Sequence, residues 1–120
     1  MAPYEPVVLH GDLGLNNVSI DPETGALLGV FDFGQACVGD PHLDLRYDPI
    51  YEAGGPGMRP SYEAARGVAL IPERVAFFHA LSALHNLSIS IDHEPPELLA
   101  IRQGWVDAVA AWDPATYSPP

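Results

Sequence analysis

The sequence predicts an α+β fold in which a short β-hairpin precedes a mainly helical remainder. Three observations support this fold class. β-branched and alternating apolar runs flank a turn in the first third of the chain, prolines and glycines interrupt the middle, and apolar residues recur at helical spacing in the last third. The chain has 120 residues, 48% of them hydrophobic, which is enough for one modest core. We therefore expect residues 1–120 to belong to a single domain.

The predicted hairpin occupies residues 7–34. Its strand candidates are the short runs 7–9, 18–20 and 26–31. The run Asp-Pro-Glu-Thr-Gly at 21–25 has the composition of a turn, because proline restricts the backbone and glycine permits conformations that other residues avoid. The open ends of the hairpin carry His10-Gly11-Asp12 and Asp32-Phe33-Gly34. We therefore expect these two acidic motifs to lie close together.

The segments after the hairpin differ in their proline and glycine content. Residues 35–60 are expected to be loop-rich, with room only for a short helix near 41–47. Residues 61–112 form the expected helical part, and 113–120 an expected coil tail.

Three helices are expected in the helical part: Ser61–Leu70 with Ser61 as its cap, Pro72–Ser90, and Glu97–Trp112. The spacing of apolar residues predicts one core face on each of the two longer helices. These faces comprise Val75, Phe78, Leu81, Leu84 or His85, and Ser88 on the first, and Leu98, Ile101, Trp105, Val109 and Trp112 on the second.

Composition excludes several classes of partner. Five basic residues against 16 acidic ones give a net charge of −11, which argues against nucleic acid and favours metal ions or cationic ligands, although a solvated acidic surface is the commoner cause of such a charge. Cys37 is the only cysteine, so an internal disulfide is impossible. The first residues have neither the basic nor the apolar region of a signal peptide, and no apolar run in the sequence approaches the length needed to span a bilayer. We expect a cytoplasmic protein without membrane contact.

The two acidic motifs have the spacing used in phosphoryl transfer. Asp12 and Asn17 form D-x-x-x-x-N behind His10, and the D-F-G motif beginning at Asp32 follows the hairpin, as in protein kinases. In that chemistry one aspartate accepts the proton of the substrate hydroxyl, while an amide oxygen and a second carboxylate hold Mg²⁺. We therefore expect Asp12 to be the catalytic base and Asn17 and Asp32 to be the Mg²⁺ ligands.

The runs HGDLGLNN and VFDFGQACVGDPHLDL resemble the catalytic segment of the aminoglycoside phosphotransferase family of small-molecule kinases. Gly11, the short return to D-F-G and the GDPxxDL motif distinguish this family from protein kinases. The resemblance implies the carboxy-terminal lobe of a protein-kinase-like fold, with ATP as phosphoryl donor, Mg²⁺ as cofactor and a small-molecule hydroxyl as acceptor.

The resemblance also implies a role for individual residues. Asp12 matches the base, and Asn17 and Asp32 match the ligands that hold Mg²⁺ and, with it, the nucleotide. The remaining motif residues match structural positions. His10 braces the loop and Gly34 completes D-F-G, while one of Asp40 and Asp44 caps the following helix and the other fixes the catalytic loop.

The sequence departs from this family in what precedes the motifs. Only nine residues precede His10, and the 120 residues contain no lysine, whereas the family uses an amino-terminal lobe with a phosphate-contacting lysine. We therefore expect a partial domain with little activity alone, and with self-association or an amino-terminal lobe covering its exposed apolar surface. The alternative is a non-catalytic lobe that serves as a binding or interaction module. A metal-dependent hydrolase built on His10, Asp12 and Asp32 would need further ligands at tight spacing, which the sequence does not offer.

Overall fold

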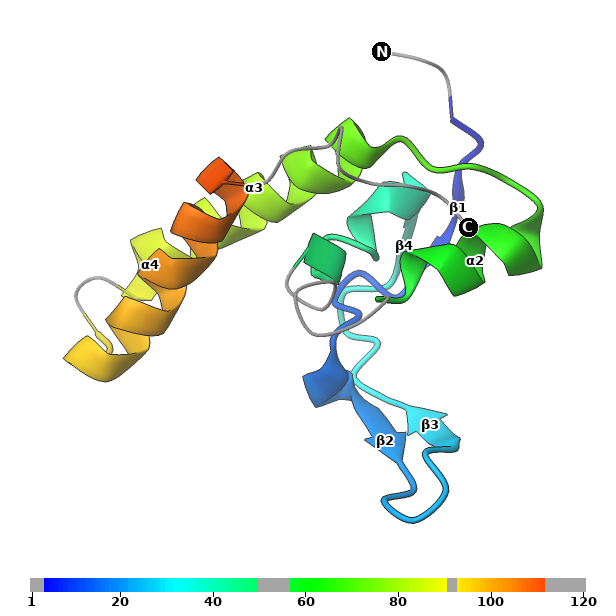
Figure 1. Cartoon of the computed structure of the whole chain (residues 1–120), viewed down its shortest axis with the longest axis horizontal. Coiled ribbons are helices and arrows are strands. Elements are labelled where there is room, and N and C mark those ends of the chain that lie inside the picture. Colours follow the sequence, from blue (N-terminus) through cyan, green and yellow to red (C-terminus); the bar gives the residue numbers. More distant parts are fainter. Residues whose placement is uncertain (1–3, 50–56, 91–92, 112–120) are drawn as a thin grey trace. The chain divides into compact units, whose positions relative to one another are not determined.

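The computed structural model describes residues 4–49, 57–90 and 93–111, and these show an α+β fold (Figure 1). The predicted fold class is confirmed. The chain divides into two compact units, residues 1–44 and 45–120, which we describe separately. The first unit contains two small antiparallel sheets and two short 3-10 helices, and the second contains the α-helices. The expected coil tail at 113–120 lies outside the described residues.

The first unit contains two pairs of strands. Strands β2 (Val18–Ile20) and β3 (Leu27–Val30) form the predicted hairpin. Strand β1 (Val7–Leu9) was expected to be part of that hairpin, but it pairs with β4 (Cys37–Gly39), which the sequence did not predict. The β1–β4 pairing joins segments about thirty residues apart, with Val7 opposite Gly39 and Leu9 opposite Cys37. It brings the GDPxxDL motif, which begins at Gly39, next to the His10 loop.

The turn of the β2–β3 hairpin is built as its composition predicts. One carboxylate oxygen of Asp21 accepts hydrogen bonds from the backbone N–H groups of Glu23 at 2.8 Å and Thr24 at 3.2 Å. These bonds favour the ionised form and lower the pKa of Asp21. Gly25 closes the turn at φ +72°, where its N–H donates to the Asp21 carbonyl oxygen at 2.8 Å.

In the second unit, helix α2 (Arg59–Arg66) is capped by a residue that the sequence did not predict. The buried carboxylate of Asp48 accepts hydrogen bonds from the backbone N–H groups of Met58 and Arg59. Ser61 was predicted to be the cap, and this prediction is wrong: Asp48, ten residues upstream of Met58, satisfies the first amides of the helix instead. The helix ends at Gly67, which adopts φ +66°.

Helices α3 (Pro72–Ser90) and α4 (Pro96–Ala111) pack side by side (Figure 1). Both were predicted to within one residue over the described range. The side chains of Glu94 and Arg102 tie the α3–α4 connection to α4 through two hydrogen bonds, Nε to Oε2 at 2.9 Å and Nη2 to Oε1 at 2.8 Å. This paired geometry with a carboxylate raises the pKa of the Arg102 guanidinium. None of the helices in the described segments is long and apolar enough to cross a membrane.

The predicted core faces of these helices are wrong in several positions. On α3 the buried side chains are Arg74, Val75, His79 and Ala83, whereas Leu81 and Leu84 are exposed. Two side chains expected to be buried on α4, Leu98 and Ile101, are exposed as well. The error has a physical cause, because α3 has apolar residues on nearly every side and its periodicity therefore does not single out one face.

His79 is a buried ionisable group of α3, as is Arg74. His79 is 2% exposed, and neither ring nitrogen has a hydrogen-bond partner of normal geometry among the described residues. Burial lowers the pKa of His79 below its ordinary 6.5, an effect that the nearby Arg46 backbone partly offsets. The unfolded chain therefore takes up a proton near pH 6.5 that the folded chain does not. Consequently the free energy of unfolding should fall as the pH drops below about 6.5.

We expect the free energy of unfolding of His79→Leu to fall less at acidic pH than that of wild type, because the variant has no group that titrates at that position. The measurement is the urea midpoint at pH 7.5 and pH 5.5 for both proteins. The control is His85→Gln, because His85 lies on the same helix but is exposed, and this variant should keep the wild-type pH dependence. An identical midpoint shift in wild type and His79→Leu would contradict the role of His79.

Candidate active site

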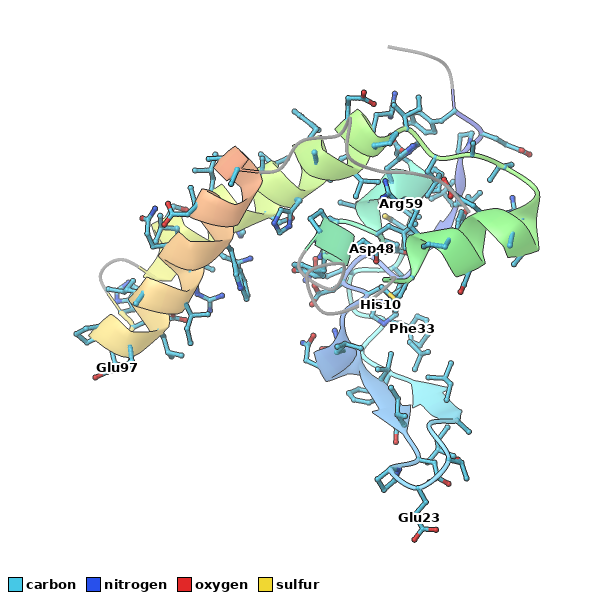
Figure 2. The ribbon with its side chains drawn as sticks, in the orientation of Figure 1. His10, Glu23, Phe33, Asp48, Arg59 and Glu97 are labelled. Carbon is cyan, nitrogen blue, oxygen red and sulfur yellow. The ribbon has the colours of Figure 1, made fainter. Side chains whose placement is uncertain are left out.

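The loop after β1 is organised by the ring of His10. Its Nε2 donates to the backbone carbonyl oxygen of Phe31 at 2.7 Å, and its Nδ1 accepts from the backbone N–H of Asp12 at 3.2 Å. A ring nitrogen that accepts an amide hydrogen carries no proton, so this arrangement corresponds to a neutral imidazole protonated at Nε2. His10 is buried, and its ring packs against that of Phe33 with the ring centroids 4.6 Å apart. The two labelled residues lie next to each other in Figure 2. His10 thus links the Asp12 loop to both sides of Asp32.

The carboxylate of Asp44 holds the backbone of the same loop. One oxygen accepts from the N–H of His10 at 2.7 Å, and the other accepts from the N–H of Gly11 at 2.8 Å. Asp40 lies nearby in sequence and caps the short 3-10 helix η2 (Pro41–Leu43), accepting from the backbone N–H of His42 at 3.0 Å. One acidic residue of the GDPxxDL motif therefore begins η2, and the other fixes the loop that follows β1.

Gly11 lies where no side chain can fit. Its φ is +87°, a left-handed conformation that costs other residues energy. A Cβ atom at this position would lie 2.1 Å from the carbonyl oxygen of Gln35, far inside van der Waals contact. The glycine therefore lets the backbone that follows D-F-G approach the Asp12 loop directly.

Asn17 fixes the position of Asp12. It is the last residue of the 3-10 helix η1 (Leu15–Asn17) and is buried. Its Nδ2 donates to the backbone carbonyl oxygen of Asp12 at 2.8 Å and approaches the carboxylate Oδ2 of Asp12 at 3.4 Å. The backbone carbonyl oxygen of Asn17 accepts a hydrogen bond from the backbone N–H of Phe31 at 3.0 Å. The Phe31 backbone is thus bonded through its N–H to Asn17 and through its carbonyl oxygen to His10.

Asp32 follows this clamped residue and has an unusual backbone. Its φ is +63°, which costs a non-glycine residue on the order of 1–2 kcal/mol. Its side chain is exposed, and among the described residues its carboxylate has no hydrogen bond or ion pair. Gly34 lies beside it, since a Cβ there would be 3.6 Å from Oδ1 of Asp32. A strained residue with an unused carboxylate is typical of a functional position.

The oxygen atoms of this site suit a magnesium ion. Because Nδ2 of Asn17 donates to Asp12, Oδ1 is its acceptor atom, and among the described residues it receives one long contact of 3.5 Å, from Nδ2 of Asn16. The carboxylate of Asp32 supplies a second oxygen donor. Mg²⁺ commonly takes one or two protein oxygens and completes its shell with water and phosphate. No group of three or more His, Cys, Asp or Glu side chains that could hold a metal occurs within the described segments.

The structure brings most of the predicted site residues into one hydrogen-bonded network, whereas Asp40 caps η2. His10, Asp12, Asn17, Asp32 and Asp44 are joined through direct bonds or through the single residue Phe31. Sequence reasoning missed the contribution of the Phe31 backbone and the carbonyl of Gln35, because a backbone contact leaves no signal in residue identity. The ring of Phe33 could have been anticipated, since it is part of D-F-G.

The sequence of this chain is similar to those of known phosphotransferases. Residues 1–78 match the sequence profile of the phosphotransferase enzyme family, which is more than half of the chain. The chain belongs to the phosphotransferase enzyme family. It is similar to the aminoglycoside 3'-phosphotransferase of Streptomyces fradiae, with 51% identity over 39 residues, which are 32% of this chain and 15% of that protein. The chain thus spans about 15% of the length of the curated relative it matches. No solved structure matches it.

The match to the phosphotransferase enzyme family includes every predicted site residue. It begins at residue 1, contains α2 and ends at residue 78 within α3. The rest of α3 and the whole of α4 lie beyond it. The family relationship therefore concerns the motifs and their support, whereas the helical pair has to be interpreted from its own residues.

Proposed function

We propose that this chain supplies the catalytic and metal-binding part of a phosphotransferase that moves the γ-phosphoryl group of ATP to a hydroxyl of a small molecule. The observation that carries the proposal is the clamped Phe31 backbone, which ties Asp12 and Asn17 on one side to Asp32 on the other. Phosphoryl transfer requires positioned carboxylates rather than covalent chemistry by the protein. A network that fixes both motifs supports this reaction.

Each residue has a proposed role in that reaction. Asp12 orients the acceptor hydroxyl and receives its proton as the hydroxyl oxygen bonds to the γ-phosphorus and the bond from that phosphorus to the bridging oxygen of the departing ADP breaks. Asn17 and Asp32 hold Mg²⁺, which when bound offsets negative charge on the phosphates. His10 and Asp44 hold the loop backbone, so that Asp12 needs little reorganisation on binding.

The proposed acceptor is an aminoglycoside or another alcohol. The name of the Streptomyces relative supports the first choice. The net charge of −11 supports it as well, since an acidic protein attracts a polycationic substrate and raises its local concentration. We propose that the reaction takes place in the cytoplasm.

We also propose that the 120 residues alone transfer phosphate poorly or not at all, so that alone they behave as a non-catalytic binding module. The supporting observation is compositional, because these residues contain no lysine to contact the nucleotide phosphates. Activity then depends on a nucleotide-covering part supplied within the same polypeptide or by a partner.

The experiment is a transfer assay with γ-labelled ATP and a panel of aminoglycosides and simple alcohols. The full-length gene product should label one class of acceptor, and EDTA should abolish the labelling. The 120 residues alone should give no labelling above the EDTA background. Absence of labelling by the full-length product with any acceptor would count against the phosphotransferase, and efficient labelling by the 120 residues alone would refute the second proposal.

A further inference from the structure

The ring of His42 takes part in the N-terminal cap of η2. His42 lies within this short helix and is 3% exposed. One carboxylate oxygen of Asp40, Oδ1, accepts from the backbone N–H of His42 at 3.0 Å and lies 2.5 Å from Nδ1 of its ring. Because an ionised carboxylate can only accept hydrogen bonds, the ring donates from Nδ1. The ring therefore holds the carboxylate that begins η2.

Helix η2 connects this pair to the carboxylate that holds the loop after β1. Asp40 is the N-cap of η2, and Asp44 is its C-cap. The backbone N–H of Leu43 donates to the carbonyl oxygen of Asp40 at 3.0 Å and closes the turn between them. Asp44 in turn accepts from the backbone N–H groups of His10 and Gly11. The direction of the Asp44 carboxylate therefore depends on the conformation of a single helical turn.

A 3-10 turn of this length needs contacts from outside its own backbone. Its hydrogen-bond geometry is poorer than that of an α-helix, and a first turn fixes several dihedral angles in return for one hydrogen bond. The Asp40 carboxylate that caps it is 6% exposed, and removing a donor from a buried carboxylate is costly. Loss of the His42 ring should therefore displace the backbone of η2.

We propose that His42 is a positioning residue that acts through Asp40, η2 and Asp44 on the backbone next to Asp12. Each step of this chain is a contact in the structure, from the His42 ring to Asp40, along η2 to Asp44, and from Asp44 to the amides of residues 10 and 11. All of these residues belong to the first unit. The effect on the loop backbone stands by itself, whereas the effect on turnover rests on the phosphotransfer proposed above.

Hydrogen exchange on the full-length gene product tests the effect on the loop without using activity. In His42→Leu the amides of His10 and Gly11 should exchange at least about tenfold faster than in wild type, because their acceptor is no longer held in place. The reference amide is that of Asp21, which donates to the carbonyl oxygen of Ala26 at 2.9 Å in the same unit and should keep its protection. Unchanged exchange at the two loop amides, or an equal loss at the reference amide, would overturn the proposal.

His42→Asn is the matched rescue variant. Its Nδ2 lies about as far along the side chain as Nδ1 of histidine and can donate to Asp40, so the protection of the two loop amides should return. His85→Leu controls for the substitution itself, since His85 is exposed and lies on α3 in the second unit, and its loop amides should exchange as in wild type. If His42→Asn lost protection as His42→Leu does, the bond to Asp40 would not be the cause and the proposal would fail.

Steady-state kinetics tests the link to turnover. In His42→Leu kcat should fall by about 10- to 100-fold, because a displaced loop misplaces Asp12, and His42→Asn should restore it. KM for Mg²⁺-ATP should change by less than about twofold, since Asn17 is bonded to the Phe31 backbone rather than to Asp44. An unchanged kcat in His42→Leu, or a change in KM alone, would overturn the role in positioning Asp12. A full-length product that transfers phosphate to no acceptor would contradict the proposed function, and the exchange experiment would still decide whether His42 holds the loop.

Discussion

Asp12→Asn should lower kcat of the full-length gene product by about 100- to 10,000-fold, the range typical for loss of a positioned general base. The substitution removes the proton acceptor but keeps the size and shape of the side chain. The backbone N–H and carbonyl oxygen of Asp12 keep their bonds to His10 and Asn17, so the loop should retain its conformation. Affinity for Mg²⁺-ATP should change little. The measurements are steady-state kinetics and a calorimetric titration of Mg²⁺-ATP.

Asp32→Asn is the contrasting variant for this experiment. It replaces one carboxylate oxygen at a proposed metal ligand, so it should weaken Mg²⁺-ATP binding, where Asp12→Asn should not. Asn tolerates a positive φ better than most residues, which keeps the backbone at φ +63° accessible. Normal turnover of Asp12→Asn would refute its role as base, and unchanged nucleotide affinity of Asp32→Asn would refute the metal role.

Gly11→Ala should destabilise the first unit by about 2–5 kcal/mol. The left-handed backbone contributes about 1–2 kcal/mol of this cost. The collision of the new Cβ with the Gln35 carbonyl oxygen contributes a further cost of about 1–3 kcal/mol, because a backbone atom cannot move aside as a flexible side chain would. The measurement is hydrogen exchange of the amides of His10 and Gly11, which donate to Asp44 in the wild type. Their protection should be lost.

Gly25→Ala separates the two contributions. Gly25 also has a positive φ, +72°, but nothing lies within 4 Å of the Cβ that alanine would add. This variant should therefore show only the backbone cost, of about 1–2 kcal/mol. If Gly11→Ala and Gly25→Ala had equal effects, the close approach of Gln35 would not stabilise the loop.

The elements that could be predicted are those determined by local chemistry. The turn at 21–25 follows from the preferences of Asp, Pro and Gly, and α3 begins at Pro72 because proline suits the first turn of a helix. Strand β4 could not be predicted, since Cys37–Gly39 has no strand pattern of its own and becomes a strand by pairing with a distant partner. The cap that Asp48 provides for α2 is also a long-range contact, and sequence spacing alone favoured Ser61.

The candidate site likewise has features that could be predicted from the sequence and features that could not. Asp12, Asn17 and Asp32 could be named from motif spacing alone, because the chemistry requires particular functional groups. What joins them could not be named, because the Phe31 and Gln35 contacts are made by peptide groups that every sequence possesses. The core face of α3 was missed for a different reason, since a helix with apolar residues on both sides offers two faces and the structure buried the one that contains His79.

The two backbone hydrogen bonds of Phe31 affect how the sequence of this segment can evolve. Phe31 is 49% exposed, while its N–H and carbonyl oxygen make the two bonds that join the motifs. Selection at this position therefore acts on the peptide unit, which is the same for nineteen amino acids and differs only in proline, the residue without an N–H. The identity of residue 31 is free to drift between homologues while the geometry of the site is inherited unchanged.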